Sequence, residues 1–256
     1  MRLCSLGSGS SGNSFIVQDD STTLLVDCGF GLSETVTRLD RYGLKPDQLN
    51  GILLTHEHED HVKGAFSFSN KYNIPIYLSH GTFKMCKKRI NENYDINFNI
   101  ISGAKSFIIN DIEVTPIPVP HDAREPFQYK FESNLKSIAI ITDLGFITNH
   151  LIKSLKDIKG LVIEFNHDKN MLLDSDYPQS LKDRVSGMYG HLENMESIKL
   201  LKSINHRNIK WIAAAHLSEK NNDENLVKRL ISDATMKEDG SIKVIDQMNG
   251  IDWMKV

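Results

Sequence analysis

One short string limits what this chain can become more than any other feature. Residues 55–61 read Thr-His-Glu-His-Glu-Asp-His, which places three histidines and an aspartate on one short stretch. Imidazole and carboxylate groups are the usual protein ligands of borderline divalent metals. The string follows a short apolar run, so a tight turn after a strand lets His56 and His58 face one ion while Asp60 and His61 face a second. A solvated polar loop is the competing interpretation, and it leaves the order of the residues unexplained.

Composition sets the outer limits. The chain has 256 residues, a formal net charge of −3, 40% hydrophobic and 25% charged residues, which are globular proportions that exclude disordered and fibrous classes. Its length suffices for a sizeable core, and its charge excludes a generally basic nucleic-acid coat protein while allowing a local basic groove. The longest apolar runs are too short to span a bilayer, and no apolar leader opens the chain, so we expect no membrane association. Cys4, Cys28 and Cys86 have no paired spacing, which favours a reducing cytoplasm.

The hydrophobic pattern predicts a mixed α/β fold. We find no linker-like shift in composition, so we expect a single domain over 1–256, built as a layered αββα sandwich. The expected strands cover 2–6, 14–18, 23–27, 51–54, 74–78, 107–109, 112–116, 137–142, 161–165, 211–215, 241–244 and 251–254. The expected helices cover 33–42, 60–72, 82–91, 151–156, 193–204 and 222–232, the first of them starting at Ser33.

The histidine string resembles the signature of the metallo-β-lactamase superfamily, and the resemblance extends over nearly the whole chain. It implies a four-layer αββα sandwich with metals at one edge. It also implies further ligands at strand ends, where Val119-Pro120-His121, Thr142-Asp143 and Ala215-His216 match the later motifs. Asp27 matches an aspartate that supports the metal-binding loop. The implied ligand set is His56, His58 and His121 for the first metal, Asp60, His61 and His216 for the second, and Asp143 as the bridge.

The implied cofactors are two divalent metal ions. The ligand set contains no cysteine, so zinc, manganese and iron are all permissible. Two ions about 3.5–4 Å apart suit hydrolysis of a phosphodiester or an acyl bond. The resemblance implies a bridging hydroxide as nucleophile, with Asp60 orienting it and accepting its proton.

One histidine outside the implied ligand set, His191, indicates a particular branch of the superfamily. Gly190-His191-Leu192 resembles a segment of the ribonuclease Z-like branch that supplies a general acid. A leaving alkoxide from a phosphodiester needs a proton, and a near-neutral imidazole suits that task. We therefore expect Asp60 and His191 to be the catalytic residues. The alternative for His191 is a surface residue preceding a helix.

Three further segments resemble the YycJ/WalJ group of the superfamily, whose members are associated with exonuclease activity on DNA. They are the Gly/Ser loop within 6–14, residues 164–168 and residues 216–222. Two departures, Glu193 in place of serine and Phe127 in place of a small residue, are expected at the substrate pocket. A Gly/Ser loop offers N–H groups and hydroxyls to phosphate, although a plain turn would look the same. The expected substrate contacts are Ser10, Ser11, Asn13, Asn166 and His167.

Three functions remain open at this point. The favoured one is a dinuclear metal-dependent exonuclease acting on DNA, for which a homodimer would be unsurprising. The second is a small-molecule hydrolase of a cyclic phosphodiester, thioester or lactam. The third is a non-catalytic module, disfavoured because all seven ligands are present. Residues Lys84 and 87–89 form either a phosphate-binding patch or a solvated helix face.

Overall fold

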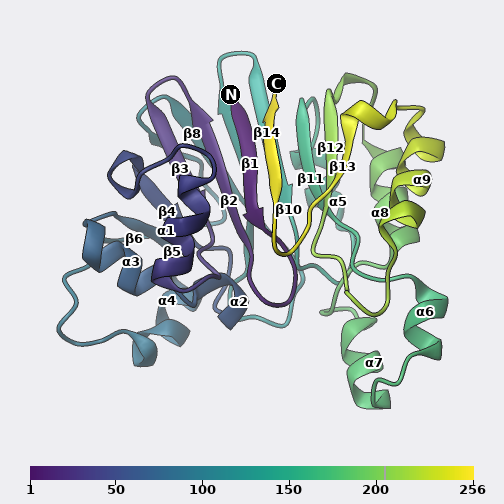
Figure 1. Cartoon of the computed structure of the whole chain (residues 1–256), viewed down its shortest axis with the longest axis horizontal. Coiled ribbons are helices and arrows are strands. Elements are labelled where there is room, and N and C mark those ends of the chain that lie inside the picture. Colours follow the sequence, from purple (N-terminus) through teal and green to yellow (C-terminus); the bar gives the residue numbers. More distant parts are fainter. Residues whose placement is uncertain (205) are drawn as a thin grey trace.

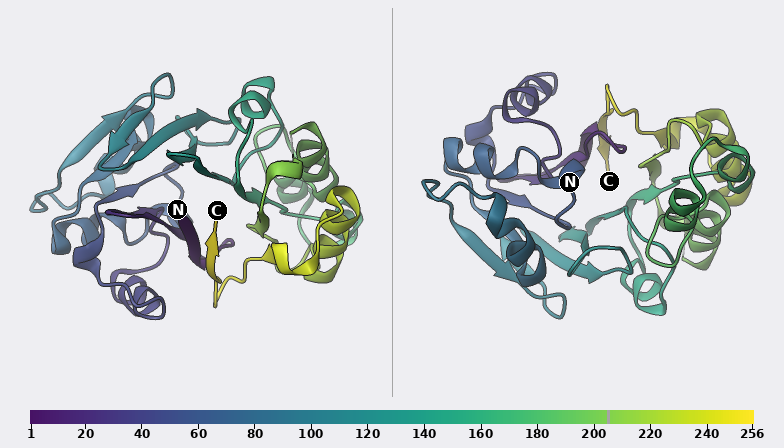
Figure 2. Two further views of the ribbon diagram at one scale, coloured as in Figure 1. Left: turned by 90° about the horizontal axis from the view of Figure 1, so that it is seen from above. Right: turned by 90° about the horizontal axis from the view of Figure 1, so that it is seen from below.

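The computed structural model describes residues 1–204 and 206–256 and shows two seven-stranded sheets packed face to face (Figures 1 and 2). In the first sheet the order is β14-β1-β2-β3-β4-β5-β6, and in the second it is β13-β12-β11-β10-β9-β8-β7. The first sheet contains β1 (Arg2–Gly7), β2 (Ser14–Asp19), β3 (Thr22–Val26), β4 (Gly51–Leu53), β5 (Ile76–Ser79), β6 (Phe98–Ile101) and β14 (Ile251–Lys255). The second contains β7 (Phe107–Ile109), β8 (Ile112–Pro118), β9 (Phe127–Ser133), β10 (Lys136–Ile141), β11 (Gly160–Glu164), β12 (Trp211–Ala215) and β13 (Ile242–Val244).

Helices cover the outer faces, which confirms the four-layer αββα sandwich (Figure 2). No helix in the described part of the chain is both long and apolar enough to cross a membrane. The helices of the first half are α1 (Leu32–Asp40), α2 (Glu59–Val62), α3 (Ala65–Tyr72) and α4 (His80–Cys86). Those of the second half are α5 (Asn149–Ser154), α6 (Lys169–Asp174), α7 (Gln179–Val185), α8 (Asn194–Ser203) and α9 (Glu224–Thr235).

Three apolar layers hold these four layers of structure together. Along β3, Leu24 and Val26 face the core between the sheets, where Ile140 of β10 meets them. Leu25 points the other way, into the layer under α1 and α3 that also contains Phe68. Successive side chains of a strand face opposite sides, so a strand buried on both sides reads as an unbroken apolar run. This explains why β3 ends in the unbroken apolar run Leu24, Leu25 and Val26 rather than alternating.

The sheet topology brings several strand ends to one edge of the sandwich. Strands β3 and β4 run parallel, as do β10, β11 and β12, so their carboxyl ends lie at the same edge within each sheet. Three residues that follow these strands have left-handed backbone conformations: Asp27 with φ 57°, Asp143 with φ 51° and His216 with φ 55°. Such a conformation costs a non-glycine residue on the order of 1 kcal/mol. The chain therefore turns sharply at each strand end, and the side chain is directed to the edge.

The expected continuous helix over 60–72 is wrong. Helix α2 ends at Val62, and α3 begins only at Ala65. The N–H of Gly64 donates to the carbonyl of Cys28 at 2.9 Å instead of continuing a helix, and a Cβ at Gly64 would lie 2.1 Å from the Phe30 carbonyl oxygen. The backbone breaks the helix because it must pass this close to the segment after β3.

Other helices and strands also differ from the expected ones. Helix α1 begins at Leu32 with Gly31 as its N-cap, so the expected start at Ser33 is wrong. The expected helix over 82–91 begins earlier, at His80, and ends at Cys86. Strands β6 and β9 and helices α6 and α7 were not expected at all. Both of these helices are too short to show a clear helical period, and every residue of α7 is exposed or half-buried, so they give little hydrophobic signal.

Candidate metal centre

The histidine string forms the loop between β4 and α2. The buried ring of His56 lies 4.5 Å from that of His58 and 4.1 Å from that of His61, measured between ring centroids. His58 is the N-cap of α2, so Asp60 and His61 occupy the first turn of this helix. Their ligating atoms, Asp60 Oδ2 and His61 Nε2, are 3.3 Å apart. Two pairs of ligands are thus placed by a single local turn.

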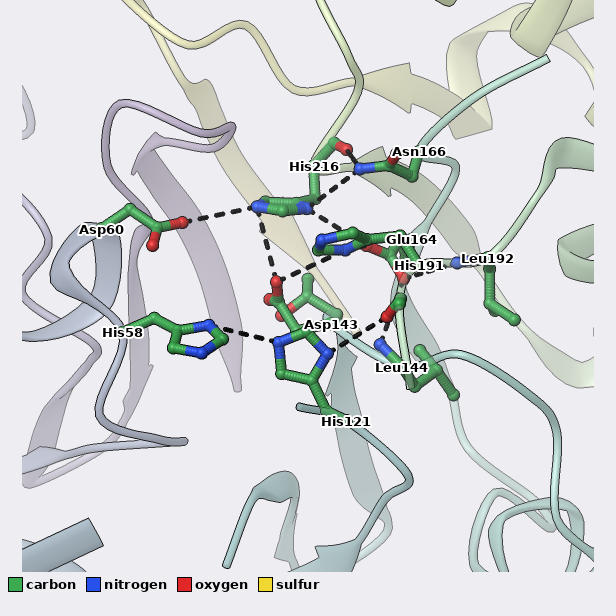
Figure 3. Close-up of polar contacts among 12 residues, drawn as sticks. His58, Asp60, His121, Asp143, Leu144, Glu164, Asn166, His191, Leu192 and His216 are labelled. Carbon is green, nitrogen blue, oxygen red and sulfur yellow. Dashed lines mark hydrogen bonds and ion pairs between the residues drawn. The ribbon is translucent and has the colours of Figure 1, made fainter. Parts of the chain in front are cut away.

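Three single residues from the second half of the chain complete the cluster (Figure 3). His121 follows β8, and its Nε2 lies 3.3 Å from Nδ1 of His58. Asp143 follows β10, and its Oδ2 lies 3.4 Å from Nε2 of His61. His216 follows β12, and its Nε2 lies 3.5 Å from Oδ1 of Asp143. Asp143 therefore has one oxygen toward a ligand of the first half and the other toward a ligand of the second half.

All seven expected ligands come together, and they form two groups. In each group the ligand atoms lie within 4.8 Å of one another. The expected division between two metals stays a prediction, because Asp143 also groups with His56 and His61 and, separately, with Glu164, His191 and His216. The groups are His56, His58 and His121, and Asp60, His61 and His216.

Unsatisfied polar atoms show that the cluster fits a metal. His56 Nε2, His216 Nε2 and Asp143 Oδ2 are buried and have no hydrogen-bond partner among the residues that the structure describes. Leaving such a buried atom unpaired costs about 1–3 kcal/mol, more for a charged group. A divalent cation in each group would satisfy them, and the all-nitrogen-and-oxygen donor set suits zinc, manganese or iron.

Hydrogen bonds on the opposite ring nitrogens orient the first-half ligands. Asp27, at the end of β3, accepts from His61 Nδ1 at 2.8 Å and from the N–H of Thr55 at 2.8 Å. The hydroxyl of Thr55 in turn contacts His56 Nδ1 at 2.9 Å. Fixing the second nitrogen of a ligating histidine sets its tautomer and orientation. Asp27 is therefore placed to support the loop, as the resemblance implied.

Glu164 plays the same part in the second half, although it was not among the residues expected at the site. It is fully buried at the end of β11, and its Oε1 lies 3.1 Å from His216 Nδ1 and 2.8 Å from His191 Nδ1. Its Oε2 accepts from the N–H groups of Leu144 and Leu192 at 3.2 and 3.1 Å (Figure 3). Two signals were available, an acidic residue closing an apolar strand and the resemblance of residues 164–168 to a family segment.

The charges around the cluster favour a cation. Burial lowers the pKa of His61, but Asp143, Asp60 and Asp27 outweigh it and hold that pKa well above its ordinary value. His56 has histidines as its main charged neighbours, and burial together with them holds its pKa well below the ordinary value. Carboxylates thus surround the second group, and a bound divalent ion would be stabilised by the same charges that favour a protonated imidazole there.

His191 lies next to two of the expected ligands, and with Asp143, Glu164 and His216 it forms a further group whose possible ligand atoms lie within 4.8 Å of one another. Its ring centroid is 5.3 Å from that of His121 and 5.0 Å from that of His216. Its side chain keeps 19% of its exposure, whereas the Glu164 carboxylate bound to it keeps none. A proton donor needs this combination of a fixed orientation and access to a substrate.

The residues expected to contact substrate fall into different settings. Asn13 is buried, and its side-chain amide donates to Asp60 Oδ2 at 3.1 Å, so it holds a ligand in place. Asn166 is also buried, and its amide donates to the carbonyl of His216 at 3.0 Å. Ser10 and Ser11 are exposed on the Gly/Ser loop. Substrate contacts by these residues remain predictions.

Three further expectations have different outcomes. His167 is buried but lines a cavity together with His191 and Glu193, so Glu193 lies where a substrate-facing residue was expected. Phe127 does not lie at a substrate pocket. It is buried in the core between the sheets, and its N–H donates to the carbonyl of Thr55 at 2.9 Å. That aromatic ring therefore packs beneath the ligand loop, where an apolar core accepts a large side chain.

The basic residues after β5 lie close to the ligand loop. Lys84, Lys87 and Lys88 are exposed, and Arg89 donates to the carbonyl of Glu57 at 3.1 Å. Glu57 belongs to the histidine string. This hydrogen bond places Arg89 next to the histidine string, and a phosphate-binding role of the basic residues stays a prediction.

Comparison with known proteins agrees with this geometry. Residues 22–212 match the family described as the beta-lactamase superfamily domain. Exodeoxyribonuclease YycJ of Bacillus anthracis is 36% identical over 229 residues, covering 89% of this chain and 86% of that protein. Exodeoxyribonuclease WalJ of Streptococcus pneumoniae is 32% identical over 224 residues, covering 86% and 83%. The solved structure of the metallo-β-lactamase fold protein YhfI from Bacillus subtilis has a TM-score of 0.76 at 14% identity, covering 100% and 98% of the two chains, which shows likeness of fold alone.

Proposed function

The chain belongs to the metallo-β-lactamase superfamily and is a metal-dependent hydrolase, and from this premise we propose that it is a dinuclear phosphodiesterase that removes nucleotides from the ends of DNA. Two relatives named exodeoxyribonuclease, each similar over more than four fifths of the chain, support the DNA substrate. The buried carboxylate of Glu164, shared by a ligand and by the non-ligand His191, supports phosphodiester chemistry, because it places a proton donor beside the ligand cluster.

The side chains divide the work between holding metal and moving protons. Two divalent ions, held by the seven ligands, would supply a nucleophile near neutral pH and polarise the phosphoryl oxygen. Asp60, which Asn13 holds at 3.1 Å, would orient the attacking water and accept its proton. Glu164 occupies Nδ1 of His191, which leaves Nε2 as the nitrogen that gives a proton to the leaving oxygen.

The decisive experiment is digestion of end-labelled linear duplex DNA and matched RNA with added manganese. Wild type should shorten the DNA progressively from its ends, and Asp60→Ala should not. A covalently closed circular duplex is the control, and it should survive because it has no end. Cleavage of the circle would indicate an endonuclease.

Failure on both polymers at full metal occupancy would contradict the proposal. A cyclic phosphodiester, a thioester and a lactam would then be tested in turn, since the same ligands serve those small-molecule hydrolases. Metal occupancy measured by elemental analysis would separate an inactive preparation from a wrong substrate.

The wider setting is also part of the proposal. We propose that residues 1–256 act as one domain, because each sheet contributes ligands to the same cluster. The three buried cysteines are compatible with the expected reducing cytoplasm. A homodimer remains a prediction that light scattering of the purified protein would test.

A further inference from the structure

A small cavity opens beside His191 and His216, on the side away from the first-half ligands. Its volume is about 200 Å³. One wall consists of Tyr177, Leu181 and Arg184, from α7 and the residues before it. The opposite wall comes from the segment after β12, which includes Ser218 and Asn221, and the Gly/Ser loop contributes Ser10. The proposed proton donor His191 therefore shares this cavity with residues that neither bind metal nor belong to the core of the fold.

The wall made by α7 is held in place by contacts to the metal cluster. The N–H of His191 donates to the carbonyl of Val185 at 2.8 Å, at the end of this helix. Arg184 Nε donates to Asp122 Oδ2 at 2.7 Å, and Asp122 Oδ1 lies 3.3 Å from His121 Nε2. In Figure 1, α6 and α7 project from the body of the sandwich at the edge that carries α2. Helix α7 buries little surface and so adds little to the core. We therefore take its contacts to the site as a sign that it takes part in the function.

The glycine before His191 shows how closely this helix approaches. A Cβ at Gly190 would lie 2.2 Å from the carbonyl oxygen of Arg184 and 2.3 Å from that of Val185. Any larger residue would therefore push α7 away from His191. The carbonyl of Gly190 also contacts His121 Nδ1 at 3.1 Å, so one glycine joins the cavity wall to a ligand.

The chemistry of the walls suits a nucleoside. Tyr177 offers a half-buried aromatic ring, and Lys220 Nζ lies 5.7 Å from its centroid. Asn221 is 1% exposed, and its side-chain oxygen has no hydrogen-bond partner among the described residues, which leaves an unused acceptor in the wall. Aromatic rings bind unstacked bases by their faces, and amides bind their edges. The cavity volume of about 200 Å³ lies below the roughly 300–1,000 Å³ of pockets for drug-sized ligands, which favours a single unit such as one nucleoside over several stacked bases.

We propose that this cavity receives the terminal nucleoside of a DNA strand, with its base against Tyr177 and its scissile phosphate beside His191. This inference rests on the proposed exonuclease function. Water adds to phosphorus, the bond from phosphorus to the oxygen of the terminal nucleoside breaks, and that oxygen takes a proton from His191. The phosphate stays on the shortened strand, and the next round therefore releases a nucleotide that carries it. A cavity that holds one nucleoside would favour a strand end over the middle of a strand.

The test compares Tyr177→Ala with wild type on linear DNA and on bis(p-nitrophenyl) phosphate. Loss of one base–aromatic contact should raise KM for DNA by about tenfold, since such a contact contributes about 1–3 kcal/mol. Turnover of the small reporter, which has no base, should stay within experimental error. Tyr177→Phe keeps the ring and should restore the wild-type KM, which would assign the effect to the aromatic ring and not to the hydroxyl.

A terminal abasic residue gives the matching substrate control. Wild type should lose its advantage over Tyr177→Ala when the terminal nucleoside has no base. Tyr189→Ala is the matched protein control, because Tyr189 is exposed near the site but does not line the cavity. It should leave KM for DNA unchanged.

The outcomes separate this inference from the proposed function. If wild type degrades DNA and Tyr177→Ala has an unchanged KM, the cavity assignment is overturned and the exonuclease function stands. An equal rise in KM for Tyr189→Ala would likewise overturn it, because the effect would belong to the surface in general. If wild type hydrolyses the reporter but leaves DNA intact, the proposed function fails, and the cavity assignment fails with it.

Discussion

The two halves of the molecule each place one buried carboxylate behind the metal ligands, and they use it differently. Asp27, after β3, binds Thr55 and His61, which lie in the same short loop. Glu164, at the end of β11, binds His191 and His216, which come from separate segments. The first carboxylate stabilises a site that the chain forms locally, whereas the second connects residues that only the sheet brings together.

The pKa values of the two carboxyl groups shift in opposite directions for the same reason. Burial raises the pKa of Asp27, and its one histidine partner and Thr55 only partly oppose this. Burial also acts on Glu164, but His191 and His216 together outweigh it and hold the pKa below its ordinary value. Two histidines thus favour the ionised form of Glu164 more than one histidine favours that of Asp27, and we expect the loss of Glu164 to disturb more of the site.

The largest effect is expected where the halves meet, at Asp143. Asp143→Asn keeps the side-chain shape and a residue type that tolerates the left-handed backbone, but it removes the charge between the two ligand groups. We expect kcat/KM for DNA to fall by about a thousandfold or more, with reduced metal content. Elemental analysis and steady-state kinetics measure both. Full metal content with near-normal turnover would show that the halves do not share this residue.

The next effect separates proton donation from metal binding. His191→Ala should leave both metals bound and slow DNA cleavage by about 10²–10⁴-fold, because the leaving oxygen loses its acid. The loss should be much smaller for bis(p-nitrophenyl) phosphate, whose leaving group needs no proton. Wild-type cleavage of DNA by this variant would rule out the acid assignment.

The difference between the two buried carboxylates is tested by comparing the variants Glu164→Gln and Asp27→Asn. Removing a carboxylate behind a ligating histidine weakens metal binding or activity by about 10–100-fold. We expect Glu164→Gln to lie at the upper end, because two histidines lose their support, and Asp27→Asn at the lower end. Metal affinity from chelator competition and kcat/KM are the measurements. The reverse order would mean that the local loop, and not the shared support, limits the site.

The smallest effect on activity is expected at the opposite edge, where Asp19 of the first sheet meets Lys136 of the second. Their closest atoms are 2.6 Å apart, and the amino terminus lies 2.7 Å from the same carboxylate. Burial opposes the charge, but these two cations lower the pKa of Asp19 from 3.8 to about 2. Asp19→Asn should therefore cost about 2 kcal/mol of unfolding free energy at pH 7 and leave kcat unchanged.

The stabilisation that Asp19 provides should depend on pH in a definite direction. A carboxyl whose pKa is lower in the folded state stabilises the fold above its ordinary pKa, and this contribution disappears as pH falls toward the folded value. The difference between wild type and Asp19→Asn should thus be full above about pH 4 and vanish near pH 2. Urea unfolding across this range measures it, with the exposed Asp20→Asn as the control. A difference that persists at pH 2 would exclude the ion pair as its cause.

Sequence reasoning predicted those parts of the site that are local or that follow a family pattern. The ligand loop could be recognised because its four ligands are adjacent in the chain. His121, Asp143 and His216 could be assigned because a resemblance placed each after an apolar strand. The role of Glu164 and the existence of α6 and α7 were not predicted. An acidic residue at the end of a strand and two short exposed helices have no distinctive sequence pattern.

The amino-acid sequence by itself determined the four-layer sandwich and the chemistry of the metal ligands, because apolar runs and adjacent donors are local properties. The tertiary structure alone decided that Glu164 supports both His191 and His216, and that Tyr177 faces the cavity beside them. The physical reason is that the parallel register of β10, β11 and β12 aligns their carboxyl ends at one edge. Side chains far apart in sequence meet there at hydrogen-bonding distance, and no spacing along the chain records it.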